Sequence, residues 1–189
     1  MRKRKNHRNT QSGFTLVEVA IVLVIIGLLV GGILKGQEMI KNAKVKNFTK
    51  QADELRAAVN TYRDRYRIFP GDDNDPVGHT GVGGLTPGNA NGQISGAEDE
   101  DVFMHLAASN LISGSYSGNF PNHTFGGTST LVWATIAGRT THWINNTNVP
   151  GDVGRMVDAS LDDGVWNTGS VRSSANYNNN VPVTLSLEF

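Results

Sequence analysis

Apolar residues follow two different patterns in the N-terminal part of the chain. The twenty-one residues from Phe14 to Leu34 are almost wholly apolar, with Glu18 as their single ionisable side chain, and as a helix they are long enough to cross roughly 30 Å of hydrocarbon. Between residues 45 and 69, apolar side chains recur instead at steps of three or four, which predicts one apolar stripe along a helix. Pro70 and Gly71 end this pattern. Together the two patterns predict one continuous helix, about 80 Å long.

The two halves of this predicted helix need different surroundings. The first half has no polar face for water, whereas the second half has one face to bury and basic side chains on much of its opposite surface. We expect the buried face to pack in the core of the chain's own folded part, and a coiled-coil partner is the alternative. The residues of the stripe are Val45, Phe48, Ala52, Leu55, Val59, Tyr62, Tyr66 and Phe69.

Weaker patterns follow in the rest of the chain. Residues 71–101 have little periodicity and are rich in Gly, Asn and Asp, which predicts a loop. Helical spacing predicts a short helix over residues 102–112, behind acids that favour a helix N-terminus, and another helix over residues 152–161. Strands are predicted at Leu131 to Ile136, Thr140 to Ile144 and Pro182 to Phe189, with a turn at Gly138-Arg139. These elements predict an α+β fold in which the long helix packs on a small, loop-rich antiparallel sheet.

The patterns divide the chain into four parts. Residues 1–13 form a basic leader that we expect to be cleaved, and residues 14–34 a transmembrane or filament-core helix. Residues 35–69 form an amphipathic stalk helix, and residues 70–189 an exported globular head. Basic flanks of a membrane span tend to stay in the cytoplasm, so the head is expected on the far side of the membrane.

The formal charge of the chain is zero, but its two signs are unevenly distributed. The leader has five basic residues and no acid, and residues 35–67 have nine basic and four acidic residues. From residue 68 onward there are three basic and twelve acidic residues. Such a head repels phosphate backbones, so we expect no nucleic-acid partner. The chain has no cysteine, which excludes disulfides and thiolate metal sites.

The order of leader and apolar run differs from that of an ordinary secreted protein. A secretory signal has its cleavage site after the apolar core, whereas here the leader ends in Gly13 and the apolar run begins at once with Phe14. Cleavage after Gly13 keeps the anchor and creates a new α-amino group on Phe14. A carboxylate at membrane depth needs a partner, and such an amine from a neighbouring subunit would neutralise Glu18. A plain signal anchor with a stray glutamate is the alternative.

The stretch Ser12-Gly13-Phe14-Thr15-Leu16-Val17-Glu18, with the apolar run behind it, resembles the type III signal of type IV prepilins. This resemblance to the type IV pilin and type II secretion pseudopilin family implies the pilin fold. It also implies cleavage between Gly13 and Phe14 by a membrane prepilin peptidase, methylation of the new amine, and assembly through Phe14 and Glu18. Residues 69–72, 88–94 and 161–164 resemble segments of other pilin-like heads, which implies a minor pilin or a pseudopilin.

The implied function is that of a structural subunit of a type IV pilus or a type II secretion pseudopilus. Such a subunit has one span in the inner membrane and a periplasmic head, and is then extracted into a filament. Its implied partners are the prepilin peptidase, other pilin or pseudopilin subunits, and an inner-membrane assembly platform with its ATPase. The alternative is a single-pass membrane adhesin or receptor whose head binds a ligand. Glu18 separates the two, because a receptor has no use for a buried carboxylate beside a cleavage site.

The head shows no pattern typical of an enzyme. It has no nucleophile motif, no phosphate-binding loop and no clustered acid and base, and its histidines lack paired metal spacing. We therefore expect no enzymatic activity and no required cofactor. Trp133, Trp143 and Trp166 are candidates for a sugar-binding surface, but we expect tryptophans of a small head to lie in its core.

Two stretches of the head suggest a structural calcium ion, which resemblance to other disulfide-free pseudopilin heads also implies. Residues 87–98 fit a twelve-residue calcium loop except for Pro87 at its first position, and an Asn-Gly turn is the alternative. Residues 162–163 are acids at the C-terminal end of a predicted helix, where the dipole disfavours anions. An Asp-Gly turn, or pairing with Arg155 or Arg172, is the alternative there. The candidate ligands are Asp72, Asp73, Asn89, Asn91, Glu98, Asp162 and Asp163.

Overall fold

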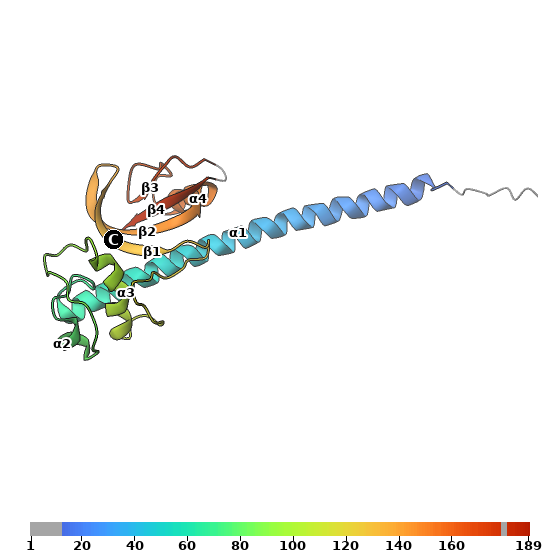
Figure 1. Cartoon of the computed structure of the whole chain (residues 1–189). Coiled ribbons are helices and arrows are strands. Elements are labelled where there is room, and N and C mark those ends of the chain that lie inside the picture. The colour runs from blue at the N-terminus through green and yellow to red at the C-terminus, as the bar shows by residue number, and fades with distance from the viewer. Residues whose placement is uncertain (1–12, 179–180) are drawn as a thin grey trace, which may run out of the picture. The chain divides into compact units, whose positions relative to one another are not determined.

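The computed structural model describes residues 13–178 and 181–189. The chain divides into two compact units, residues 1–42 and 43–189, and helix α1 (Leu16–Tyr66) contributes to both (Figure 1). The predicted long helix is therefore confirmed. The predicted leader lies outside the described residues, apart from Gly13. The predicted bounds at residues 34 and 69 concern a membrane and an exported head, which the division into compact units does not test, and they stay predictions.

The second unit is built on a four-stranded antiparallel sheet. In chain order its elements are α2 (Pro76–Thr80), α3 (Glu98–Ala108), β1 (Ser129–Ile136), β2 (Arg139–Pro150), α4 (Gly151–Leu161), β3 (Val171–Ser173) and β4 (Pro182–Glu188). The strand order is β1-β2-β4-β3, so β4 inserts between β2 and the short edge strand β3. The predicted α+β fold with a long N-terminal helix on an antiparallel sheet is confirmed.

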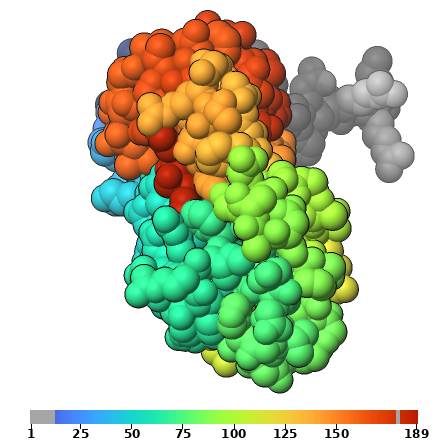
Figure 2. Space-filling model, turned by 90° about the vertical axis from the view of Figure 1, so that its left-hand side faces the viewer, coloured from blue at the N-terminus to red at the C-terminus, as the bar shows by residue number. Residues whose placement is uncertain are grey.

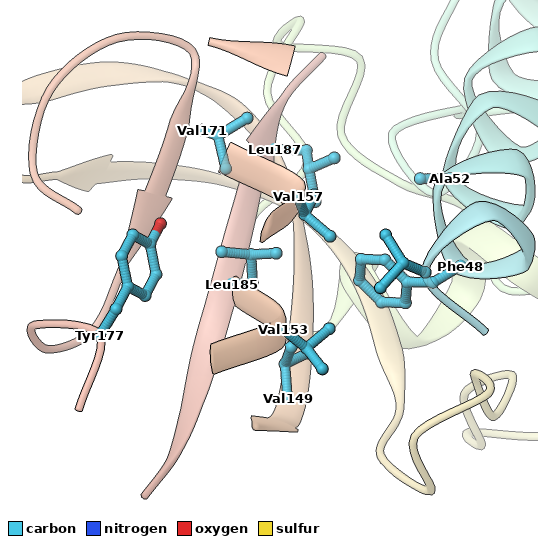
Figure 3. Packing of buried hydrophobic residues seen from close by; sticks show 10 residues of the cluster. Phe48, Ala52, Val149, Val153, Val157, Val171, Tyr177, Leu185 and Leu187 are labelled. Carbon is cyan, nitrogen blue, oxygen red and sulfur yellow. The ribbon is translucent and has the colours of Figure 1, made fainter. Parts of the chain in front are cut away.

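The predicted apolar stripe of α1 packs against this sheet in the core of the second unit. Phe48 and Ala52 point toward apolar side chains of β2, β4 and α4 (Figure 3). Further along α1, Val59 and Tyr62 join a second cluster with α3, β1 and β2. Both residues are completely buried. The expectation that the stripe forms the core of the chain's own fold is therefore confirmed.

Local predictions differ from the structure at several points, among them helix α3, which lies at Glu98–Ala108 and not at residues 102–112. The turn between β1 and β2 lies at Ala137-Gly138, one residue earlier than predicted, and both residues have positive φ angles, 47° and 85°. Helix α2 lies within the stretch that was predicted as loop, where the side chain of Asp75 accepts a hydrogen bond from the backbone N–H of Gly78. Strand β3 was not predicted at all. It is only three residues long, too short for an alternating pattern to stand out.

Candidate functional site

The candidate processing site lies just before the first turn of α1. Gly13 and Phe14 precede the first helical residue, and Phe14 is 89% exposed. A Cβ atom added to Gly13 would meet nothing within 4 Å. The peptide bond between these two residues is thus neither helical nor covered by other described parts of the chain. The structure leaves this bond open to an enzyme, as a cleavage site requires.

Glu18 and Thr15 are joined by three hydrogen bonds. The backbone N–H and the hydroxyl of Thr15 each donate to Glu18 Oε2 at 2.8 Å, and the backbone N–H of Glu18 donates to Thr15 Oγ1 at 3.2 Å. This is a capping box, which satisfies N–H groups that a helix start otherwise leaves without partners. The sequence reasoning missed it, although the spacing Thr-x-x-Glu before an apolar run is its usual signal. In the described chain, Glu18 forms no ion pair.

The apolar run behind Glu18 is uncovered. Among the described residues, α1 is the one helix long and apolar enough to span a membrane, and none of the residues in its most apolar window is buried. Leu28 is 74% exposed and Leu29 60% exposed, although water disfavours such surfaces. A helix that is apolar all round requires lipid or other apolar helices around it. The structure thus joins an exposed peptide bond at residues 13–14, a carboxylate in the first helical turn and an uncovered apolar helix within one segment.

Comparison with known proteins assigns this same segment to a family. Residues 8–34 match the model of the prokaryotic N-terminal methylation motif. The chain is also 40% identical over 62 residues to a fimbrial protein of Moraxella nonliquefaciens. The chain is type IV pilin-like. Pilin-like proteins are structural subunits rather than enzymes, so the prediction that this one is not an enzyme is confirmed.

The similarity of this pilin-like chain to the fimbrial protein covers only part of either chain. The aligned segment covers 32% of the chain and spans 40% of the fimbrial protein's own length. No solved structure matches the chain. The matched residues 8–34 include Gly13, Phe14 and Glu18.

The candidate calcium ligands of the head fall into three separate groups. The first group contains Asp72, Asn89, Asn91 and Glu98. Asp72 accepts hydrogen bonds from the backbone N–H groups of Asn91 and Gly92, at 2.9 and 2.8 Å. Glu98 accepts from both nitrogens of Asn89 through Oε1 and from the backbone N–H of Ser95 through Oε2. Every carboxylate oxygen of this group already has an N–H donor, which favours the Asn-Gly turn over a cation.

Asp73 faces a different environment from its neighbour Asp72. It is completely buried, and its Oδ2 atom accepts a hydrogen bond from the hydroxyl of Tyr62 at 2.5 Å and lies 2.7 Å from His79 Nδ1. Although burial alone raises the pKa of the Asp73 carboxyl, the bonds to His79 and Tyr62 outweigh it and lower the pKa. Asp73 therefore ties the end of α1 to the loop that follows.

The third group brings Asp162 and Asp163 together with Asp158, which the sequence reasoning missed. Ligand atoms of these three carboxylates lie within 4.8 Å of one another. Asp158 is completely buried, and its pKa is raised by burial and by the charges of its two neighbours. Arg172 and Arg155 donate hydrogen bonds to backbone carbonyls, and the pKa of Asp163 is lowered by the hydrogen bond from Thr168 and also by the charge of Arg172. Asp163 forms an Asx turn by accepting from the backbone N–H of Val165.

The tryptophans do not form an exposed platform. Trp143 is completely buried, and its indole N–H donates to the backbone carbonyl of Ala134. Trp133 packs edge-on against His142, and the partly buried Trp166 packs against the core cluster that contains Phe48. The core interpretation of these residues is therefore confirmed for Trp143 and favoured for the other two.

Proposed function

We propose that this chain is a filament subunit that is cleaved between Gly13 and Phe14 and then joined to its neighbours through Glu18. One observation carries the proposal: an uncovered apolar helix begins directly behind the cleavage site and contains a single carboxylate in its first turn. After cleavage, the new amine of Phe14 in one subunit neutralises Glu18 of the next. Paired in this way, the carboxylate can be buried in a bundle of apolar helices.

Within this class we propose a minor pilin or a pseudopilin of an inner-membrane assembly system. The resemblance of three head segments to other pilin-like heads, at residues 69–72, 88–94 and 161–164, supports this choice. The partners in this proposal are a prepilin peptidase that also methylates Phe14, sister subunits, and an assembly platform with its ATPase. The head would lie in the periplasm before extraction and in a periplasmic or surface filament afterwards.

The cleavage is tested by intact-mass analysis of protein extracted from membranes. We expect loss of residues 1–13 and a methylated N-terminus at Phe14, and we expect Gly13→Leu to leave the full precursor in the membrane. A Cβ atom added to Gly13 meets nothing within 4 Å in the described chain, so the loss of cleavage would arise at the peptidase and not from misfolding. An N-terminus that remains at Met1 in a peptidase-competent cell would contradict the proposal, because an uncleaved adhesin or receptor anchor would then explain the segment better.

We also propose calcium at Asp158, Asp162 and Asp163, where ligand atoms of three carboxylates lie within 4.8 Å of one another and Asp162 Oδ1 accepts no hydrogen bond from the described residues. Oxygen ligands of this kind suit calcium. A ligand that binds only the folded state stabilises it, by about 2.7 kcal/mol at a concentration of one hundred times the dissociation constant. We therefore expect the melting temperature of the full chain in detergent to be several degrees higher in calcium chloride than in a chelator.

Two variants separate this site from the other candidate loop. Asp163→Asn should remove most of the calcium response, whereas Glu98→Gln should retain it, because Glu98 lies outside this cluster of carboxylates. Exposed Glu100 provides a matched control, Glu100→Gln, on the acidic turn of α3. Equal melting temperatures of the wild type in calcium and chelator would dispose of the site.

A further inference from the structure

The segment that connects α1 to α3, residues 69–95, has few regular hydrogen bonds of its own. Apart from the five-residue helix α2 it is irregular. Figure 2 shows this connecting segment, in teal and green, as a broad surface of the head below the orange strands. Contacts with the rest of the head must therefore hold it in place. Two of these contacts, one near each end, are made by buried histidines.

His105 of α3 holds the beginning of the connecting segment. Its ring is completely buried, and Nδ1 accepts a hydrogen bond from the backbone N–H of Gly71 at 2.9 Å. Its other nitrogen, Nε2, lies 2.9 Å from the backbone carbonyl of Thr86. A carbonyl only accepts, so Nε2 carries the proton and Nδ1 is free to accept. This pair of bonds requires the neutral ring.

His142 of β2 holds the end of the same segment. Its Nε2 atom accepts a hydrogen bond from the backbone N–H of Ile94 at 3.3 Å. The ring is 6% exposed and lies among the aromatic rings of Phe69, Trp133 and Phe189. A protonated Nε2 cannot accept this bond, so the contact again requires a neutral histidine.

The charged groups around the two rings act in opposite directions. Burial lowers the pKa of both histidines, to about 4 for His142. Near His105, the carboxylates of Asp101 and Asp73 partly offset this effect, whereas the guanidinium of Arg63 adds to it near His142. Tyr62, stacked on His105, titrates only at high pH because its pKa is raised by burial and by Asp73. A proton on His142 is therefore the less tolerated of the two.

We propose that His105 and His142 are acid-sensitive latches. At neutral pH they hold the two ends of the connecting segment closed, because each accepts a backbone hydrogen bond from that segment. Protonation of the two rings breaks these bonds and opens the two ends. Several contacts do not require a neutral histidine, among them the hydrogen bond from the hydroxyl of Tyr62 to Asp73 and the one from the backbone N–H of Trp133 to the carbonyl of Ile94, and these two remain in acid. Opening is thus local, and the rest of the head stays folded. The device would make the outer surface of the head respond to the pH outside the cytoplasm.

The direction of the effect follows from proton linkage. The pKa of an exposed histidine is about 6.5, and that of buried His142 is about 4. The free energy that favours the closed state is therefore fully present above pH 6.5 and is lost as the pH falls toward about 4. For His142 alone, these values imply that the opening equilibrium rises roughly thirty-fold between pH 7.5 and pH 5.0. Protonation of His105 adds to this factor.

Hydrogen exchange of the full chain in detergent micelles tests the proposal, since the Gly71 and Ile94 amides themselves donate to the histidines. We expect their protection factors, corrected for intrinsic exchange, to fall at least ten-fold from pH 7.5 to pH 5.0. Amides of the β2–β4 ladder should stay protected. Equal protection at both pH values, or loss in step with the β2–β4 amides, would overturn the proposal, because the first shows no latch and the second shows global unfolding.

A variant that cannot titrate provides the decisive comparison. The side-chain carbonyl of His142→Gln can accept from Ile94 in place of Nε2, but it gains no proton in this range. We expect this variant to keep Ile94 protected at pH 5.0 while Gly71, which depends on His105, still loses protection. His123→Gln is the control, since His123 is a buried histidine whose Nδ1 atom accepts from Phe125, outside the connecting segment. Wild-type pH dependence at Ile94 in His142→Gln would refute the latch.

Discussion

Replacing Glu18 by alanine is expected to exclude the chain from filaments without disturbing its insertion, cleavage or folding. The two consequences of the change have opposite signs. A charge at the centre of a membrane span costs about 2.5–3.5 kcal/mol on insertion scales and less near the interface, so its removal makes the anchor at least as stable. The same change deletes the partner of the neighbouring Phe14 amine, which would then be buried without a counter-charge.

The readout is the share of the chain in the sheared or crosslinked filament fraction beside the share in the membrane fraction. Glu18→Gln should fail similarly, because the amide keeps the shape and a bond to Thr15 but lacks the charge. Glu38→Gln is a matched control on the same helix, since Glu38 is exposed and forms an ion pair with Lys35. Wild-type incorporation of both Glu18 variants would contradict the assembly role. Partial incorporation would instead indicate a subunit that caps the filament tip.

The N-terminal site was predictable because its signals are local. The leader, the apolar run and Glu18 follow one another in the sequence, and the structure adds only the bond between Thr15 and Glu18. The core stripe of α1 was predictable for a related reason, since a helix repeats its buried positions at fixed steps. Neither prediction depended on which distant segments meet.

The head was less predictable where distant residues decide the local structure. Strand β2 continues to Pro150, well beyond the predicted end at Ile144. It continues because Asn146 is buried and its side-chain amide donates to the carbonyls of Ile144 and Leu185. A bulge follows, with Asn148 at a positive φ of 56°. Such a strand depends on its partner β4, which lies almost forty residues away.

The candidate metal sites show the same limit. The spacing of Asn89, Asn91 and Glu98 fits a calcium loop, but spacing alone cannot show that Asp72, earlier in the chain, supplies acceptors for the N–H groups of that loop. Similarly, Asp158 was placed only as part of a predicted helix. Its burial against the hydroxyl of Tyr177 arises from the return of the chain after β3, whereas its closeness to Asp162 follows from their spacing of four residues at the end of α4.

Replacing Gly88 by alanine is expected to destabilise the head by roughly 3–5 kcal/mol, because the loop that contains it lies directly on the backbone after α1. A Cβ atom at Gly88 would lie 2.3 Å from the carbonyl oxygen of Gly71 and 2.5 Å from Cα of Asp72. Backbone atoms cannot rotate away as the end of a side chain can. The loop would have to move, and the N–H groups of Asn91 and Gly92 would then lose the carboxylate of Asp72.

Gly84→Ala in the same connecting segment is the matched control for this prediction. A Cβ atom at Gly84 would meet nothing within 4 Å, so alanine causes no clash there. The remaining cost is backbone strain at a φ of 83°, which should destabilise the head by about 1 kcal/mol. Thermal unfolding of the full chain in detergent, followed by tryptophan fluorescence, measures the difference, since Trp133, Trp143 and Trp166 all lie in the head. We expect Gly88→Ala to lower the melting temperature by about 10 °C and Gly84→Ala by a few degrees. Equal, small shifts would show that the loop yields at little cost, and that Asp72 does not hold it as the hydrogen bonds suggest.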